Sequence, residues 1–140
     1  MTAWSPLASG ILSGKYHGHG SSEPGRLSTD MMKEFMPEQQ QTGRVVAAVK
    51  NVSDETGRSM AHVALAWLRH RPAPVIPIIG ARKLSQLQDN LASLDLTLSA
   101  DQLKTLDEAS RIELGFPHDM YAKAMVHAIR YGGMRDKILA

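Results

Sequence analysis

Two adjacent cations, Arg82 and Lys83, follow a glycine in the stretch VIPIIGARKLSQLQDN, residues 75–90, and could bind an anion. A short apolar run ends at Gly80, Arg82 and Lys83 come next, and a helix is expected after them. A strand that leads into a helix N-terminus leaves free backbone N–H groups and the positive end of the helix dipole, which favour an anion. The stretch therefore predicts a phosphate site. The alternative is an ordinary strand-to-helix turn with two solvated cations.

The histidines, serines and cysteines of a metal or catalytic site are not found at the spacing that such a site needs. His17 and His19 are too few ligands to predict a metal site in a glycine-rich loop. Ser59 and His62 fit a helix start better than a nucleophile and its base, and no acyl-transfer triad is visible. The chain has no cysteine, which excludes disulfides and thiolate metal sites and permits a reducing cytoplasm.

The sequence predicts two short strands, one near the N-terminus and one just before the two cations. Residues 2–9 predict a strand that ends at Pro6, and residues 10–30 predict a long loop rich in Gly, Ser and His, of the kind that is usually functional or mobile. Residues 75–79 predict a buried strand, although Pro77 removes one backbone donor from it.

Helices are expected between and after these strands. Ser59 is a plausible N-cap for a helix that Pro72 ends, and Ser99 with Gln102 forms a capping box for a later helix. The tail, residues 111–140, predicts partly helical structure. Apolar spacing predicts two further helices. One ends at Gly57 and is predicted by Val45, Val46, Val49 and Val52. The other, over residues 84–94, is predicted by Leu84, Leu87, Leu91 and Leu94.

Composition limits the classes of function. The chain has 140 residues, 43% hydrophobic and 21% charged, as expected for one soluble globular unit. The net charge is +2, but the cations are scattered and only 5% of residues are aromatic, so no nucleic-acid surface is indicated. No apolar run reaches the roughly 20 residues of a membrane span, and the N-terminus lacks the features of a signal peptide. A cytoplasmic protein without nucleic-acid or membrane partners is expected.

The order of these elements is strand, loop, helices, strand, helices. This order is typical of a βαβα unit with two parallel strands. A parallel sheet needs cover on both faces, and two strands are too few for the apolar faces of four or more helices. We therefore expect part of the sheet to be missing from this chain.

Three motifs carry a resemblance to a known family: WSPLASGILSGKY at residues 4–16, IPIIGARKLSQLQDNL at 76–91 and ELGFPHDMY at 113–121. They resemble the C-terminal part of the aldo-keto reductases, in the branch similar to potassium-channel β subunits. Members of this family are (β/α)8 TIM barrels that bind NADPH at the C-terminal mouth and reduce aldehydes and ketones. The resemblance implies an α/β fold in which residues 1–140 form a partial, truncated barrel domain. It would hold the last two strands, their helices and the C-terminal extension, whereas a complete barrel takes about 250 residues.

The resemblance also assigns cofactor-binding roles to the first motif. Trp4 matches the aromatic residue that stacks on the nicotinamide ring, and the alternative is a tryptophan that lines the barrel core. Lys15 corresponds to a cation on the pyrophosphate. Arg26 matches an arginine that helps to clasp the cofactor in some relatives, and otherwise it is a solvated loop charge. The segment beside the nicotinamide ribose and pyrophosphate corresponds to Ser5, Pro6, Leu7, Ser9 and Gly10.

In the second motif, the resemblance implies that Gly80, Arg82, Gln86, Asp89 and Asn90 hold the adenosine 2′-phosphate and the adenine. The last three lie three and four residues apart and would share one helix face. Relatives often carry Ser or Thr in one of the two positions that Arg82 and the following lysine occupy here. That departure weakens the helix cap but adds positive charge for a phosphate, so NADP is favoured over NAD.

The catalytic residues of the family have no counterpart in this chain. The family uses a tyrosine as proton donor, supported by lysine, aspartate and histidine, all from earlier strands. Tyr16, Tyr121 and Tyr131 have no matching surroundings. We expect the NADP-binding segment of an NADPH-dependent reductase, which meets NADPH and a small carbonyl substrate only in a complete barrel. The alternative is a non-catalytic nucleotide-binding or interaction module that pairs with itself or with another half-barrel.

Overall fold

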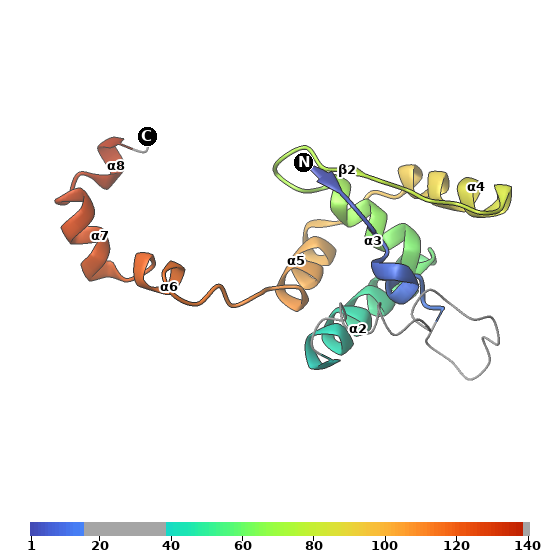
Figure 1. Ribbon diagram of the computed structural model, residues 1–140, viewed down its shortest axis with the longest axis horizontal. Coiled ribbons are helices and arrows are strands. Elements are labelled where there is room, and N and C mark those ends of the chain that lie inside the picture. Colours follow the sequence, from blue (N-terminus) through green and yellow to red (C-terminus); the bar gives the residue numbers. More distant parts are fainter. Residues whose placement is uncertain (16–38, 139–140) are drawn as a thin grey trace. The chain divides into compact units, whose positions relative to one another are not determined.

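The computed structural model describes residues 1–15 and 39–138, and Figure 1 shows the order of its elements. The chain divides into two compact units, Met1–Ser110 and Arg111–Ala140. The first unit contains two short strands, with helices between and after them, and the second contains three short helices. The site predicted from the sequence falls within the first unit.

The two strands form the parallel pair that the sequence predicts. β1 (Thr2–Ala3) lies beside β2 (Ile76–Pro77), with Ala3 opposite Pro77. The Ile78 N–H donates to the Ala3 carbonyl at 2.9 Å. Because successive N–H groups of a strand point to opposite sides, the nitrogen of Pro77 faces away from β1, and its missing donor does not interrupt this ladder.

Among the described residues, two α-helices lie between the strands, after the 3-10 segment η1 (Ala8–Ser13). α2 (Gln39–Thr56) ends before Gly57, whose φ of 62° is the left-handed conformation that glycine adopts readily. α3 (Met60–Arg69) begins at Ser59, as predicted, and the Ser59 hydroxyl accepts a hydrogen bond from the His62 N–H at 3.2 Å. The helix start is therefore fixed by a local side chain.

The helices after β2 also follow the predicted order. α4 (Leu84–Ala92) is continued by a short 3-10 segment, η3 (Ser93–Asp95), and α5 (Ala100–Ala109) follows. The predicted capping box of α5 is confirmed: the Gln102 N–H donates to the Ser99 hydroxyl at 3.2 Å, and the Ser99 N–H donates to the side-chain oxygen Oε1 of Gln102 at 3.0 Å.

The core of the first unit lies among α2, α3, α5 and the 3-10 segment η1 (Ala8–Ser13). α3 is at its centre, since Val63 and Ala66 are fully buried. Packing of these helices, rather than the two-residue strands, holds the unit together. The remaining residues of the cluster are Ile11, Val46, Ala48, Val49, Val52, Met60, Leu96, Leu98 and Leu106.

Three element boundaries differ from the sequence predictions. The strand predicted over residues 2–9 stops after Ala3, and the strand predicted over 75–79 is reduced to two residues. The helix predicted over 84–94 ends two residues early and tightens into η3. The first strand is short because positive φ angles of 52°, 47° and 57° break the extended chain at Ser5, Ala8 and Ser9.

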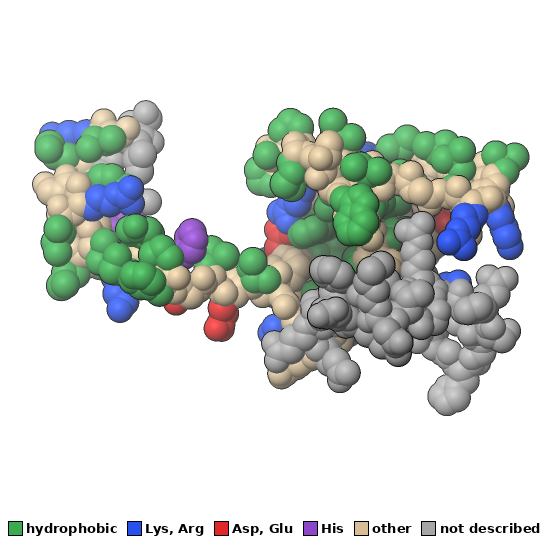
Figure 2. Space-filling view, viewed as in Figure 1, with side chains coloured by type: hydrophobic (Ala, Val, Ile, Leu, Met, Phe, Trp, Pro, Cys, Tyr) green, Lys and Arg blue, Asp and Glu red, His purple; other side chains and the backbone are tan. Residues whose placement is uncertain are grey.

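The predicted apolar face of α4 is only partly covered by the described residues of the first unit. Leu84 is 71% exposed and Leu94 is 58% exposed, and Leu87 and Leu91 are also exposed. Apolar side chains gather along the surface of β2 and α4 in the space-filling view (Figure 2). We call these residues, together with Ile76 and Ile78, the leucine face: Ile76, Ile78, Leu84, Leu87, Leu91 and Leu94. Large apolar surfaces of this kind mark contacts with other polypeptide.

The second unit confirms the prediction of partly helical structure. It contains α6 (His118–Tyr121), α7 (Ala124–Tyr131) and α8 (Arg135–Ile138). The Arg130 guanidinium lies 5.4 Å from the centre of the Tyr131 ring, within reach of a cation–π interaction. Throughout the part of the chain that the structure describes, helices are too short or too polar to cross a membrane.

Candidate functional site

The carboxyl ends of the two strands bring the two predicted binding segments to the same sheet edge. β1 leads into Trp4 and β2 leads into Gly80, and parallel strands end on the same side. In parallel α/β sheets, ligands bind outside this edge. Trp4 is 78% exposed, so within the described residues it is not a core side chain. Its stacking role stays a prediction.

The segment after β1 is a compact turn with an unusual backbone. Ser5, Ala8 and Ser9 have positive φ angles, and Gly10 has a φ of 99°. The Ser5 hydroxyl accepts from the Ser9 N–H at 3.3 Å, and the Leu7 carbonyl accepts from the Gly10 N–H at 2.9 Å. Non-glycine residues in this conformation cost free energy, and such residues cluster at ligand sites. The turn also contains Pro6.

The first turn of α4 is capped by Gln86. Its side-chain oxygen accepts from the Arg82 N–H at 2.9 Å and from the Lys83 N–H at 3.3 Å. The expected loss of a Ser or Thr cap is therefore compensated three residues into the helix. Because these two N–H groups are occupied, a phosphate here would be held by the cationic side chains and the next N–H groups of the helix, those of Leu84 and Ser85.

The cations at this position are open to a ligand. Arg82 and Lys83 are exposed, and among the described residues no carboxylate forms an ion pair with either. Basic side chains are visible where α4 begins (Figure 2). An ideal Cβ at Gly80 would meet no atom within 4 Å, so the backbone before the cations is also uncovered. Charge, exposure and helix direction together suit an anion.

The predicted adenine residues of α4 do not all share one environment. Gln86 and Asp89 are exposed, whereas Asn90 is buried at 7% exposure. The Asn90 carbonyl accepts from the Ser93 hydroxyl at 2.6 Å, which supports the tightening of the chain into η3. Spacing predicted that these three residues share one helix face, but not that Asn90 is buried while the other two are exposed.

His62 is a residue of this site that the sequence reasoning missed. Its ring nitrogen Nε2 lies 2.7 Å from the Asp89 carbonyl oxygen and 3.0 Å from the Asp89 carboxylate. In the sequence, His62 shows no partnered catalytic spacing, and Asp89 lies 27 positions away from it. The available signal was a polar residue within the apolar run of a buried helix, which normally has a hydrogen-bond partner.

Of the two other predicted cations, one lies among the described residues. Lys15 lies just after Gly14, whose φ of 75° ends η1, and it is half-buried. Arg26 falls in residues 16–38, as do Tyr16, His17 and His19, outside the described residues. Within the described ranges, no group of three His, Asp or Glu side chains could hold a metal ion.

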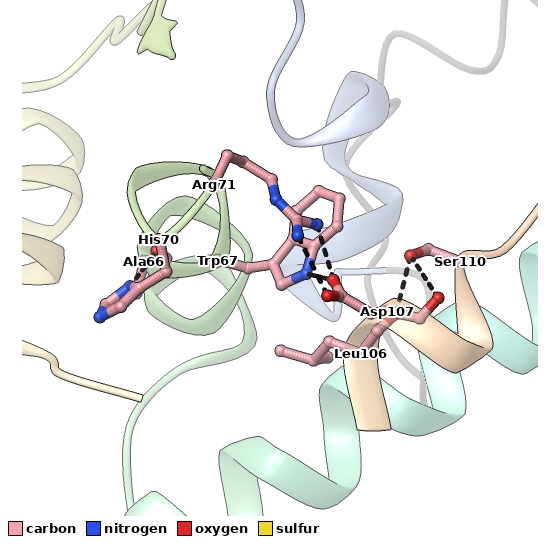
Figure 3. Close-up of polar contacts among 7 residues, drawn as sticks. All are labelled: Ala66, Trp67, His70, Arg71, Leu106, Asp107 and Ser110. Atoms are coloured by element: carbon pink, nitrogen blue, oxygen red, sulfur yellow. Dashed lines mark hydrogen bonds and ion pairs between the residues drawn. The ribbon is translucent and has the colours of Figure 1, made fainter. Parts of the chain in front are cut away.

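Sequence reasoning also missed a cluster of Trp67, Arg71 and Asp107, which stabilises the first unit. Asp107 of α5 accepts from both guanidinium nitrogens of Arg71, at 2.6 and 3.0 Å, and from the Trp67 indole N–H at 2.7 Å (Figure 3). The guanidinium also lies 4.4 Å from the centre of the Trp67 ring. These contacts tie the end of α3 to α5, so we call the three residues the α3–α5 clamp. They are structural, since their side chains are already paired with one another.

Comparisons with known proteins agree with the motifs. The model of the Aldo/keto reductase family matches residues 1–111. An Arabidopsis thaliana protein named "Probable voltage-gated potassium channel subunit beta" is 34% identical over 98 residues, which cover 69% of this chain and 30% of the relative. "Aldo-keto reductase ausK" of Aspergillus calidoustus is 41% identical over 76 residues, 54% of this chain and 18% of the relative.

A third relative carries a cofactor in its name. "Aryl-alcohol dehydrogenase [NADP(+)]" of Phanerodontia chrysosporium is 35% identical over 79 residues, 56% of this chain and 20% of the relative. The chain spans about a third or less of the length of the curated relatives named here.

Proposed function

Because this chain belongs to the aldo/keto reductase family, we propose that it is the C-terminal, NADP-binding segment of an oxidoreductase that reduces aldehydes or ketones. The family's fold is the (β/α)8 barrel, and the parallel β1–β2 pair with its helices fits two successive repeats of such a barrel. In the complete enzyme, hydride would pass from NADPH to a small carbonyl substrate, which becomes an alcohol.

The observation that carries this proposal is the unpaired cationic turn at the sheet edge where both strands end. Arg82 and Lys83 lie at the start of α4, exposed and without a carboxylate partner among the described residues. We assign the adenosine 2′-phosphate to this turn. A guanidinium can donate two parallel hydrogen bonds to a phosphate, which makes Arg82 the stronger contact. A cofactor without that phosphate would gain nothing from it.

The remaining cofactor contacts follow from the order of the segments. Trp4 lies at the end of β1 and is exposed, so its ring can cover the nicotinamide. The positive-φ turn that follows would lie beside the ribose and pyrophosphate, where a compact backbone permits a close approach. Gln86, Asp89 and Asn90 are proposed for the adenine end, with Gln86 acting mainly through the cap that it provides.

The leucine face supports the proposal that more of the barrel is needed. Its residues lie on β2, just after it and along α4, and the described residues of the first unit leave each of them between 42% and 71% exposed. The family's proton-donor motifs are absent from this sequence, so catalysis would need residues from the preceding repeats. We propose that these repeats pack against the leucine face. Self-association through the same face is the alternative, and the chain would then be a nucleotide-binding module without catalysis.

Cofactor titration of the full chain tests this function. Arg82→Ala should weaken NADPH binding by about 10- to 150-fold, as expected for the loss of a charge-assisted phosphate contact, while NADH binding changes little. Lys83→Ala should weaken it less, because an ammonium acts as a point charge. Arg58→Ala, at an exposed arginine between α2 and α3, is the matched control.

Two results would count against the proposal. If Arg82→Ala weakens NADPH and NADH equally, the residue does not bind the 2′-phosphate. If the wild-type chain binds neither cofactor, it does not carry a functional nucleotide site by itself, and mixing with the missing repeats decides whether they complete one.

A further inference from the structure

We propose that His62 is a positioning residue for the adenine end of the cofactor, because it fixes the direction of the Asp89 carboxylate. This inference rests on the proposed function and adds to it a residue that contacts no part of the cofactor. His62 belongs to α3, whereas Asp89 belongs to α4, so the pair joins a core helix to the helix that carries the binding residues.

The geometry determines which nitrogen of His62 carries a proton. Nε2 faces two oxygens of Asp89, the main-chain carbonyl at 2.7 Å and the carboxylate Oδ1 at 3.0 Å. Both are acceptors, so Nε2 must be the donor. The other ring nitrogen, Nδ1, is buried and has no hydrogen-bond partner among the described residues. A proton there would be buried and unpaired, so the Nε2–H tautomer is the one that fits.

In this arrangement the two carboxylate oxygens of Asp89 have different roles. Oδ1 is directed toward a histidine side chain that is only 9% exposed, while the Asp89 side chain is 55% exposed. Oδ2 has no bond of its own to a described residue and is left for a ligand. The exocyclic amine of adenine is a hydrogen-bond donor, and a carboxylate is an acceptor.

The same contact also limits the motion of Asp89. A half-exposed aspartate normally samples several rotamers, and a ligand must immobilise it at an entropic cost. His62 holds the main-chain and side-chain oxygens of Asp89 together, so the orientation exists before the cofactor arrives. Polar groups at the two ends of α3 have partners of their own: Ser59 caps the helix, and the Arg69 guanidinium donates to the Ser93 carbonyl at 2.8 Å.

Base discrimination tests the inference. The probe is NADPH against its hypoxanthine analogue, in which a carbonyl replaces the exocyclic amine of adenine. The wild-type chain should prefer NADPH. His62→Leu should weaken NADPH binding by about 5- to 30-fold, which is part of the roughly 10- to 150-fold that one hydrogen bond to a charged group contributes, and should remove most of the preference. His62→Gln, whose amide can donate from nearly the same place, should keep it.

Three further measurements separate positioning from a general structural defect. His70→Gln, at the C-cap residue of α3, is the matched control and should leave the preference unchanged. Because His62 is buried, its leucine variant could unfold the unit, so Asp89→Ala, at an exposed side chain, serves as a second test and should remove the same preference. In either background, the ratio of NADPH to NADH affinity should still depend on Arg82.

The outcomes are distinguishable. A chain that binds neither NADPH nor NADH, alone or mixed with the preceding barrel repeats, overturns the proposed function and this inference together. A chain that binds NADPH through Arg82, but keeps its base preference in folded His62→Leu and in Asp89→Ala, overturns the positioning role of His62 alone.

Discussion

Replacing Asp107 by alanine should lower the free energy of unfolding of the chain by about 2 kcal/mol. The carboxylate of Asp107 accepts two hydrogen bonds from Arg71 and one from the Trp67 indole. The ion pair is screened, because the two side chains are 27% and 44% exposed, so we assign it about 1 kcal/mol. The bond from the indole N–H contributes about another 1 kcal/mol.

Denaturant unfolding of single and double variants measures these contributions separately. Asp107→Ala, Arg71→Ala and the double variant form a cycle whose coupling energy should be about 1 kcal/mol. Trp67→Phe keeps an aromatic ring but removes the N–H donor, and is the matched control for the third bond. High salt should reduce the arginine contribution and leave the indole contribution nearly unchanged.

The difference in unfolding free energy between the parent chain and Asp107→Ala should depend on pH, because it follows the pKa of Asp107 in the parent. Hydrogen bonds from Arg71 lower this pKa below its ordinary value of 3.8, burial opposes the shift, and the Trp67 bond and the Arg71 charge add to it. A lowered pKa in the folded state means that the unfolded chain takes up the proton first. The stabilisation is therefore complete above the ordinary value and is lost as the pH falls through the folded pKa.

Two results would refute this account of the clamp. One is an Asp107→Ala variant that unfolds within about 0.3 kcal/mol of the parent chain at neutral pH. The other is a difference between variant and parent that stays constant as the pH falls below the ordinary pKa of an aspartate.

Two further predictions concern the chain as a whole. The chain alone should show no appreciable carbonyl reductase activity, because general acid catalysis, typically worth about 10² to 10⁴ in rate, has no matching donor in this sequence; NADPH oxidation over a panel of aldehydes and ketones measures this, and turnover at an ordinary enzyme's rate would contradict it. The leucine face should make the isolated chain self-associate. Light scattering tests this prediction, and a monodisperse monomer with a cooperative melt would show that the face needs no partner. Leu87→Lys and Leu91→Lys should reduce the association if the face is responsible for it.

Local signals in the sequence were enough to place the main helices. Ser59 and the pair Ser99 and Gln102 act on the helix that they begin, so their positions alone predict its start. Gly57 likewise ends α2 through its own backbone conformation. Order and type of these elements followed from caps and apolar spacing, and the structure confirms both.

Features that depend on distant residues could not be predicted in the same way. Trp67 bonds to Asp107 across 40 positions, and nothing in the local pattern of either residue indicates the other. The backbone of Ser5 and Ser9 adopts positive φ angles that residue preferences disfavour, so the turn was mistaken for the end of a strand. Spacing predicted the apolar side chains along α4, but not that the described part of the chain leaves them exposed.

The strand pairing has a consequence for synthesis of the chain. The amino group of Met1 donates to the Pro74 carbonyl, and these partners are 73 positions apart. A ribosome that adds about 5 to 20 residues per second needs about 4 to 15 s to bridge this interval. Helices α2 and α3 are complete before β2 emerges, so their packing can shorten the loop that the strands must close. Until then β1 and Trp4 lack the strand beside them, so the edge that is proposed to hold the cofactor assembles only after α2 and α3 are complete.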